Sequence, residues 1–444
     1  MIQKPNGTYD LLPEDTTKWQ ALEKTIRNVS KIYNYKEIRT PIFEKTELFH
    51  RGVGESTDIV SKETYDFIDR GNRSNTLRPE GTAPVVRSYI ENKIYADKFP
   101  VTKLYYMGSM FRYERPQKGR YRQFAQFGAE AFGSTSPLLD AEIISYAVSV
   151  LKALKIKDVK VHLNSIGDAE SKEAYKLALV DYLKDDLDSL CHDCNTRFKT
   201  NPMRILDCKI DSKSDFLQNA PKPLEYLNEA SKNHFADVIK FLDAMDIAYV
   251  IDESLVRGLD YYTHTVFEVK ANLETLGAQN TICGGGRYNT LVSSLGGPDI
   301  PGVGFAFGLE RLMFALDSIN FKGDPSYLHL YLMVLGEKQK EDGIAILNRC
   351  RLGGLFSDID YMDKNMKGQF KLAGNFNARF VAIYGEAEKA DGTINIKDQD
   401  NGTEVTIPKE QLYNHIVQEL MKPSHSCEGC SEDSCDTCDE EEEN

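Results

Sequence analysis

A short polar segment between residues 111 and 124, FRYERPQKGRYRQF, is dense in basic side chains. Guanidinium groups bind phosphate oxygens through paired, charge-assisted hydrogen bonds, so this segment could hold a nucleotide or a nucleic acid. The alternative is a solvated basic hairpin in which an arginine pairs with Glu114 on one face. The basic residues are Arg112, Arg115, Lys118, Arg120 and Arg122.

A second phosphate-binding candidate lies in GVGFAFGLERL, residues 302–312. The pattern predicts a glycine-rich strand that leads into a helix, with Arg311 about one turn in. A glycine run that serves helix packing is the alternative for this motif alone. The sequence contains no GxxxxGK[ST] loop, so a bound nucleotide would depend on arginines from separate segments.

These arginines need strands to position them. Residues 103–133 predict two strands around a polar turn, and side chains on a strand alternate between its faces. On the second strand, one face would carry Gln126 and Glu130 between Phe124 and Phe132. Gly128 on the same face would leave room for a ligand.

Further along the chain, the pattern indicates two domains and a tail. An amphipathic helix opens the chain from Trp19, and a strand is expected over residues 37–43. Residues 165–245 form a helical insertion in a strand-rich domain that covers residues 1–325. Alternating strands and helices predict a small α/β domain at 326–422, and residues 423–444 are expected to be a disordered tail.

Composition sets broad limits on function. The 444 residues are 41% hydrophobic, without a signal peptide or a long apolar span, so we expect a cytoplasmic protein without a membrane segment. The formal net charge is -14, yet nine acidic residues lie beyond Lys422. Bulk charge therefore neither supports nor excludes a nucleic-acid partner.

Residues 111–133 and 302–312 together resemble motifs 2 and 3 of the class II aminoacyl-tRNA synthetases, and EIRTPIFEKTELFHR (37–51) resembles motif 1. Two further peptides, RGLDYYTHTVFEV (257–269) and CGGGRYNTLV (283–292), are similar to segments peculiar to the histidyl-tRNA synthetase family. The resemblance covers about residues 1–420. It implies a class II α+β catalytic domain on an antiparallel sheet, a helical insertion, an anticodon-binding α/β domain and, through motif 1, a homodimer.

The resemblance also implies site residues. In this family the amino acid would be histidine, held by its ammonium, imidazole and carboxylate groups. Thr82 could instead be the N-cap of a helix, and Glu130 a structural ion-pair partner. The implied histidine-binding residues are Glu80, Gly81, Thr82, Gln126, Glu130, Tyr261 and Tyr262.

By the same resemblance, Arg112 and Arg257 would be catalytic and grip the α-phosphate of ATP, which enters with Mg²⁺. Glu114, Arg120 and Arg311 would complete the ATP site. Arg115 and Gln117 would contact the acceptor end of tRNA(His), although ordinary turn residues are the alternative. The rival function is a non-catalytic regulatory subunit of ATP phosphoribosyltransferase, which would lack the second domain and usually the ATP arginines.

The cysteines are the last candidates. Cys191, Cys194 and Cys208 form an incomplete zinc pattern, with His192 or His234 as a possible fourth ligand, and free buried thiols are the preferred interpretation. The tail offers two CxxC pairs that could bind a soft metal, though no apolar residues surround them to form a core. They are Cys427, Cys430, Cys435 and Cys438.

Overall fold

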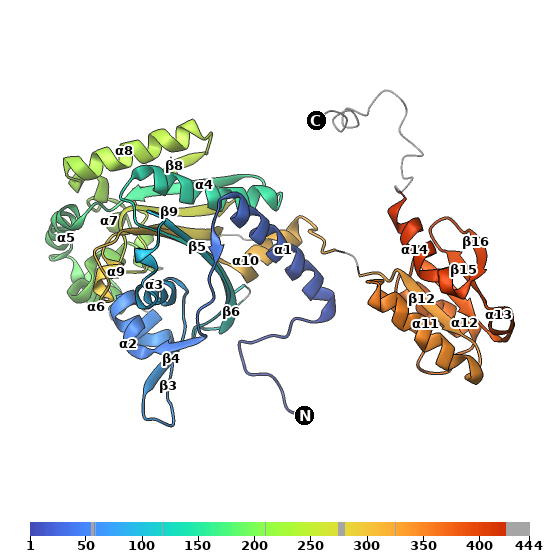
Figure 1. Ribbon diagram of the computed structural model, residues 1–444. Coiled ribbons are helices and arrows are strands. Elements are labelled where there is room, and N and C mark those ends of the chain that lie inside the picture. Colours follow the sequence, from blue (N-terminus) through green and yellow to red (C-terminus); the bar gives the residue numbers. More distant parts are fainter. Residues whose placement is uncertain are drawn as a thin grey trace. The chain divides into compact units, whose positions relative to one another are not determined.

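The computed structural model describes residues 1–422, apart from 55, 56, 58, 118, 209, 274–279 and 325. The tail beyond Lys422, with its four cysteines, lies outside the described residues. The chain divides into two units, Met1–Gly323 and a second that begins at Asp324 (Figure 1). No helix within the described ranges has the length and apolar character needed to span a membrane.

An eight-stranded sheet forms the centre of the first unit. Neighbours from β5 to β7 in the sheet are antiparallel, and β1 and β8 join the two edges in parallel. The predicted antiparallel sheet is therefore confirmed. In sheet order the strands are β1 (Lys36–Glu37), β5 (Thr102–Phe111), β6 (Gln123–Phe132), β11 (Gly302–Gly308), β10 (Thr281–Tyr288), β9 (Thr263–Ala271), β7 (Val159–Ser165) and β8 (Tyr249–Ile251).

Helices cover one face of this sheet. The predicted opening helix is α1 (Pro13–Ile32), which buries Trp19, Leu22 and Ile26 at helical spacing. It packs with α4 (Pro137–Ala153) and α8 (Glu229–Ala244) against a shared apolar core. The β6 residues Phe127, Ala129 and Ala131 belong to this core, so their neighbours in sequence point to the opposite face.

The expected strand over 37–43 is wrong in extent. The chain instead forms β1 and a separate strand β2 (Phe43–Lys45), which pairs with β4 (Ser74–Leu77) beside β3 (Tyr65–Ile68) in a small second sheet. The Arg78 guanidinium donates to the carbonyl oxygens of Thr40 at 3.0 Å and Pro41 at 3.3 Å. These carbonyls are therefore occupied by a side chain and not by a neighbouring strand.

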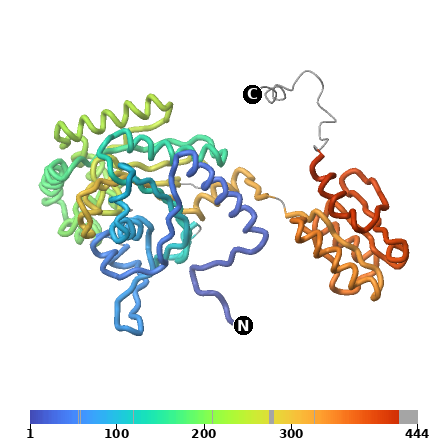
Figure 2. The backbone as a smooth tube through the Cα atoms, in the orientation of Figure 1, coloured from blue at the N-terminus to red at the C-terminus, as the bar shows by residue number. Residues whose placement is uncertain are grey.

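An excursion of mostly helical chain separates β7 from β8. It contains α5 (Ala169–Leu183), α6 (His192–Thr200), α7 (Asp215–Gln218) and α8, and Figure 2 draws it mainly in green. Asp168 caps α5 and Asn228 caps α8, each by accepting from a backbone N–H three residues on. The Asn228 amide also donates to Asp168 at 2.8 Å, which ties the two helix starts together.

Short helices border the free face of the central sheet, which is the face opposite α1, α4 and α8. α2 (Thr46–Phe49) and α3 (Thr82–Glu91) precede β5, while α9 (Leu291–Ser294) follows β10. α10 (Leu309–Ser318) begins directly where β11 ends, as the glycine-rich motif predicts. Side chains of α3, α5 and α6 form a second apolar core together with sheet residues such as Tyr106 and Phe132.

The second unit is the small α/β structure that the sequence predicts. Its sheet has the order β13 (Ser357–Ile359), β12 (Leu330–Val334), β14 (Phe380–Tyr384), β15 (Thr393–Asp398) and β16 (Glu404–Pro408). The first three strands are parallel and the last two antiparallel. The helices are α11 (Lys340–Leu352), α12 (Met366–Asn375), α13 (Glu386–Asp391) and α14 (Leu412–Met421).

Candidate active site

The free face of the central sheet carries a cavity of about 550 Å³. Eleven of the site residues expected from the sequence line it, brought together from four separated parts of the chain. They are Glu80, Thr82, Arg112, Glu114, Arg120, Gln126, Glu130, Arg257, Tyr261, Tyr262 and Arg311. Gly81 lies between two of them, where a side chain would meet the ring of Tyr106.

The start of α3 forms one wall of the cavity. The carboxylate of Glu80 accepts from the backbone N–H groups of Thr82 at 2.6 Å and Ala83 at 2.7 Å. Glu80 therefore satisfies the first turn of the helix, and the interpretation of Thr82 as the N-cap is wrong, because Gly81 holds that position. The Thr82 hydroxyl is left to donate into the cavity.

The Thr82 hydroxyl donates to Glu130, a fully buried acid of the site. Glu130 Oε1 accepts from Thr82 at 2.8 Å, and the Tyr288 hydroxyl donates to Oε2. Burial raises the pKa of Glu130 to about 8, against the lowering effect of both hydroxyl donors. Within the described residues Glu130 has hydroxyl partners and no ion pair, so the structural ion-pair interpretation is wrong.

Gly304 on β11 faces Glu130 across the sheet ladder. A Cβ atom there would lie 1.9 Å from the Glu130 carboxylate. The absence of a side chain at Gly304 thus makes space for the acid.

Gly128 has a different role from the expected one. A Cβ atom at Gly128 would lie 2.3 Å from the Tyr106 hydroxyl, and one at Gly81 would also collide with this ring. The space beside Gly128 is therefore filled by a tyrosine and is not open to a ligand. The correct part of that prediction is the alternation, because Phe124, Gln126 and Glu130 all face the cavity.

Gln126 and the tyrosine pair complete the polar pocket. Oε1 of Gln126 is buried and has no hydrogen-bond partner among the described residues. The rings of Tyr261 and Tyr262 lie 4.7 Å apart, and Gly286 on β10 leaves the space that the Tyr262 ring occupies. The pocket therefore combines an acid, hydroxyl groups and a free amide oxygen.

Arg257 is a further residue that lines the cavity. Its guanidinium pairs with Glu268 on β9, while its Nε atom is buried without a partner among the residues described. Gly284 makes this placement possible, since a Cβ there would lie 2.3 Å from the guanidinium. Burial lowers the pKa of Arg257, but the combined attraction of Glu268 and the other acidic groups around it is larger, so the net pKa is raised.

The other arginines gather at the end of the cavity formed by residues 112–121 and α10. Arg112 donates to the Pro79 carbonyl at 2.8 Å, and Arg120 lies 3.3 Å from Glu114. Arg311 donates to the Thr281 carbonyl at 2.9 Å, and burial together with the charge of Arg120 lowers its pKa. Positive charge accumulates here in a setting that favours a polyanion.

Some of the basic side chains in the turn between β5 and β6 already contact other side chains of the protein. Arg120 is paired with Glu114, and the Arg122 guanidinium lies 3.9 Å from the centre of the Tyr113 ring. Arg115 and Gln117 are exposed and lie outside the main cavity. Gln117 and Arg120 exchange backbone hydrogen bonds across a tight turn. Arg115 and Gln117 are therefore separated from the predicted site residues that line the cavity.

Several residues that line the cavity are not predicted from the sequence. Tyr288, Glu268, Asp207 and Glu310 line it, and Glu310 accepts from Ala125 N–H at 2.8 Å. Tyr288 could have been found, because it follows Gly284 and Gly286 at period two on one strand. Asp207 comes from the insertion, where no pattern indicates proximity to the cavity.

Two protein-family models match the chain. A family model described as histidyl-tRNA synthetase matches residues 7–312, and an anticodon binding domain model matches residues 329–419. The chain belongs to the histidyl-tRNA synthetase family. The class II fold predicted from motifs 1 to 3 is thereby confirmed.

Relatives match along nearly the whole chain. The histidine--tRNA ligase of Geobacillus sp. (strain WCH70) is 48% identical over 420 residues, covering 94% of this chain and 99% of the relative. That of Bacillus licheniformis is 51% identical over 404 residues, covering 91% and 95%. The crystal structure of apo histidyl-tRNA synthetase from S. aureus superposes with a TM-score of 0.81 at 40% identity, covering 94% of this chain and all of that one.

The hydroxyl donors of Glu130 give a first prediction. A hydrogen bond to the ionised form lowers a carboxyl pKa, so Tyr288→Phe should raise the pKa of Glu130 above about 8. Carboxyl ¹³C shifts of labelled protein, followed against pH, would measure it. Tyr146→Phe is the matched control, because that buried hydroxyl donates to Ser30. A pKa that falls or stays unchanged in Tyr288→Phe would contradict the hydrogen-bond assignment.

Proposed function

We propose that the chain activates L-histidine with ATP to histidyl-adenylate and pyrophosphate, and then transfers histidine to the 3′ end of tRNA(His). The observation that carries the proposal is a single cavity with a buried polar pocket at one end and clustered guanidinium groups at the other. The named activity of relatives at 48% and 51% identity supports it.

The pocket end suits histidine. A histidine side chain has two ring nitrogens, and we assign one to the Glu130 carboxylate and the other to the Tyr262 hydroxyl. The α-ammonium would meet Glu80, Thr82 and Oε1 of Gln126, which has no partner among the described residues, with Gly81 and Tyr261 as the walls of this part. Histidine would thus replace hydrogen bonds within the pocket by its own.

The arginine end suits the triphosphate. A carboxylate oxygen of histidine attacks the α-phosphorus, the bond to the bridging oxygen breaks, and pyrophosphate leaves. Because charge spreads over phosphoryl oxygens in such a transition state, positioned cations provide most of the stabilisation. Arg112 and Arg257 would hold the α-phosphate, and Arg120 and Arg311 the β- and γ-phosphates.

Mg²⁺ would enter as part of the substrate MgATP. Magnesium prefers carboxylate and phosphate oxygens, and Glu114 presents a carboxylate among the arginines at this end. The 4.0 Å between the Arg112 guanidinium and Glu114 is compatible with rearrangement when phosphate arrives.

For tRNA, the exposed turn and the second unit are the proposed contacts. Arg115 borders a shallow depression with Asn6, Pro116 and Arg122, outside the main cavity. Together with Gln117 it would reach the acceptor end, while the unit from Asp324 would bind the anticodon stem. That unit has 12 basic and 14 acidic residues between Tyr327 and Lys422, so placement of charge must matter more than its sum.

The regulatory-subunit alternative fits less well. Such a subunit would lack the anticodon-binding domain, whereas residues 329–419 match one. It would also have no use for the arginines that line this cavity. The relatives at about half identity are named as ligases over nearly the same length.

We further propose a homodimer, and the cytoplasm as its location, where the proposed substrates occur. Support for the dimer comes from exposed apolar side chains in and beside motif 1. Ile42 and Phe43 are 49% and 53% exposed, and Phe67 and Ile68 on β3 are 40% and 62% exposed. A second copy of the chain would bury them.

The function is tested by pyrophosphate exchange into ATP with each of the twenty amino acids in turn. We expect exchange with histidine alone. Exchange with none would favour the regulatory interpretation, and exchange with another amino acid would contradict the assignment of the pocket.

The role of Arg257 gives a sharper test. Loss of one preorganised donor in a comparable site costs about 10² to 10³ in rate, so Arg257→Ala should lower histidine-dependent exchange by that factor. Gly284→Ala retains the arginine but displaces its guanidinium, and should also reduce exchange.

Arg27→Ala is the matched control, since this arginine pairs with Glu23 on α1. It should leave exchange unchanged. Retention of exchange within tenfold in Arg257→Ala would show that Arg257 does not hold the α-phosphate.

The dimer is tested by light scattering after gel filtration. The unmodified chain should have twice the mass of one chain, and Phe43→Glu should shift it toward the monomer, because a buried carboxylate at an apolar contact is costly. Leu352→Glu, at an 80% exposed position of α11, should remain dimeric. A monomeric unmodified chain would disprove the dimer.

A further inference from the structure

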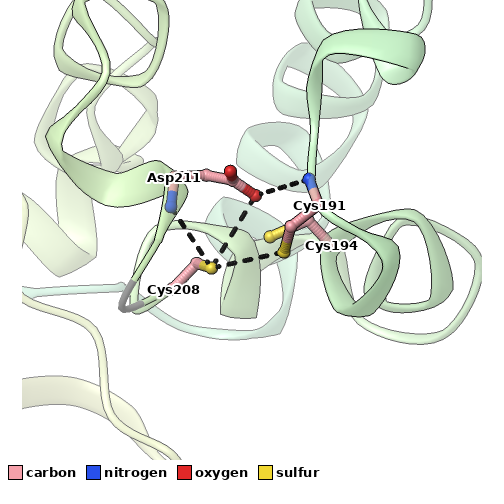
Figure 3. Close-up of side chains that lie close together, drawn as sticks. All are labelled: Cys191, Cys194, Cys208 and Asp211. Carbon is pink, nitrogen blue, oxygen red and sulfur yellow. Dashed lines mark hydrogen bonds between the residues drawn. The ribbon is translucent and has the colours of Figure 1, made fainter.

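Three cysteines and an aspartate that do not line the main cavity converge inside the insertion. Cys191 is the N-cap of α6 and Cys194 lies in its first turn. Cys208 and Asp211 follow the short helix Pro202–Ile205, and Asp211 begins another short helix, Asp211–Lys213. Figure 3 shows the four side chains pointing toward one common centre.

The sequence spacing repeats in both halves of this cluster. Cys191 and Cys194 are separated by two residues, as are Cys208 and Asp211, so the pattern is C-x2-C-x13-C-x2-D. Small structural zinc sites are commonly built from two such pairs of ligands, each pair with two residues between its members. The incomplete cysteine pattern seen in the sequence thus acquires a fourth member, which is an acid and not a histidine.

The distances fit a tetrahedral ion. One sulfur or oxygen from each residue lies within 4.8 Å of the others. Cys191 Sγ and Cys208 Sγ are 3.7 Å apart, and Cys208 Sγ lies 3.7 Å from Asp211 Oδ2. Two Zn–S bonds of about 2.3 Å at the tetrahedral angle would place their sulfurs about 3.8 Å apart.

The burial of the group calls for a cation. Cys194 is fully buried, and Cys208 and Asp211 are 5% and 8% exposed. In the described parts of the chain Asp211 forms no salt bridge, and its carboxylate accepts from the Cys191 N–H at 3.0 Å. A buried carboxylate is normally paired or bound to a metal.

Backbone groups already support a thiolate. The N–H groups of Ile210 and Asp211 both lie 3.4 Å from Cys208 Sγ. At the other half, Cys191 and Cys194 stand at the start of α6, where the helix dipole favours negative charge. Such outer contacts orient and stabilise metal ligands.

We propose that Cys191, Cys194, Cys208 and Asp211 bind one structural Zn²⁺ ion in tetrahedral coordination. On binding, Zn²⁺ replaces the three thiol protons, which pass to solvent, and the site then carries three thiolates, one carboxylate and the metal. All four positions are taken by protein atoms, so the site is closed and does not bind substrate.

The competing interpretations account for fewer observations. A disulfide between Cys191 and Cys208 would leave Cys194 and Asp211 unexplained. The earlier fourth-ligand candidates are placed elsewhere, since His192 is exposed and His234 lies 3.5 Å from Asp140. Unliganded thiols would leave the buried acid without a cation.

Zinc would also fix the chain beside the active site. Asp207, next to Cys208, lines the main cavity, and Asn201 at the end of α6 donates to Asp260 at 2.6 Å. The segment between these residues is therefore held at one end by the cluster and at the other by the loop that carries Arg257.

The test is zinc content of the purified full chain by elemental mass spectrometry. Because the tail has four cysteines of its own, all four are first changed to serine. We expect this background to retain about one zinc ion per chain. Adding Cys194→Ser should remove it, whereas Cys350→Ser, a buried thiol of the second unit, should not.

Asp211→Cys should keep the ion, since it supplies another tetrahedral ligand, while Asp211→Ala should weaken its retention against a chelator. A background without zinc, or zinc that persists in Cys194→Ser, would overturn the proposal. If Cys194→Ser does not fold, Co²⁺ added to the background chain decides, because tetrahedral thiolate coordination gives intense visible bands. Absence of those bands, or a chain two hydrogens lighter by intact mass, would also overturn it.

Discussion

Glu130 is buried in the central sheet, where no described residue forms a salt bridge with it, and a carboxyl group in that setting needs hydrogen-bond donors. Much of the surrounding structure meets this need. Gly304 on the neighbouring strand leaves the space, and Tyr288 and Thr82 supply hydroxyl groups. Thr82 can do so because Glu80 takes over the capping of α3.

The glycines of β10 serve the side chains of a neighbouring segment in the same way. Gly284 makes room for Arg257 and Gly286 for Tyr262, so two glycines of one strand shape the cavity. The guanidinium groups are held by carbonyl oxygens and single carboxylates. Such partners fix the direction in which each guanidinium group points.

Strand alternation was the most reliable guide from sequence to site. It placed Gln126 and Glu130 on one face of β6, and it could also have found Tyr288. It could not show that Tyr106, from β5, fills the space beside Gly128, because that depends on packing between strands. The short extent of β1 likewise depends on Arg78, which is distant in sequence.

The insertion was the least predictable region. Asp207 reaches the cavity, and Asp211 joins the cysteines, only through the fold of residues 201–213. Neither acid stands in a periodic pattern. The cysteine spacing was visible, but cysteine and histidine were the expected ligand types, so the aspartate was missed.

The hydrogen bonds of Glu130 have a consequence for discrimination between amino acids. An amino acid that enters must disturb contacts that are already satisfied, and each buried polar group left without a replacement costs about 1 to 3 kcal/mol. A small or apolar side chain has nothing to return to the acid or the hydroxyl groups. In the proposed mode of binding, a ring with suitably placed nitrogen atoms would replace these hydrogen bonds, which favours histidine.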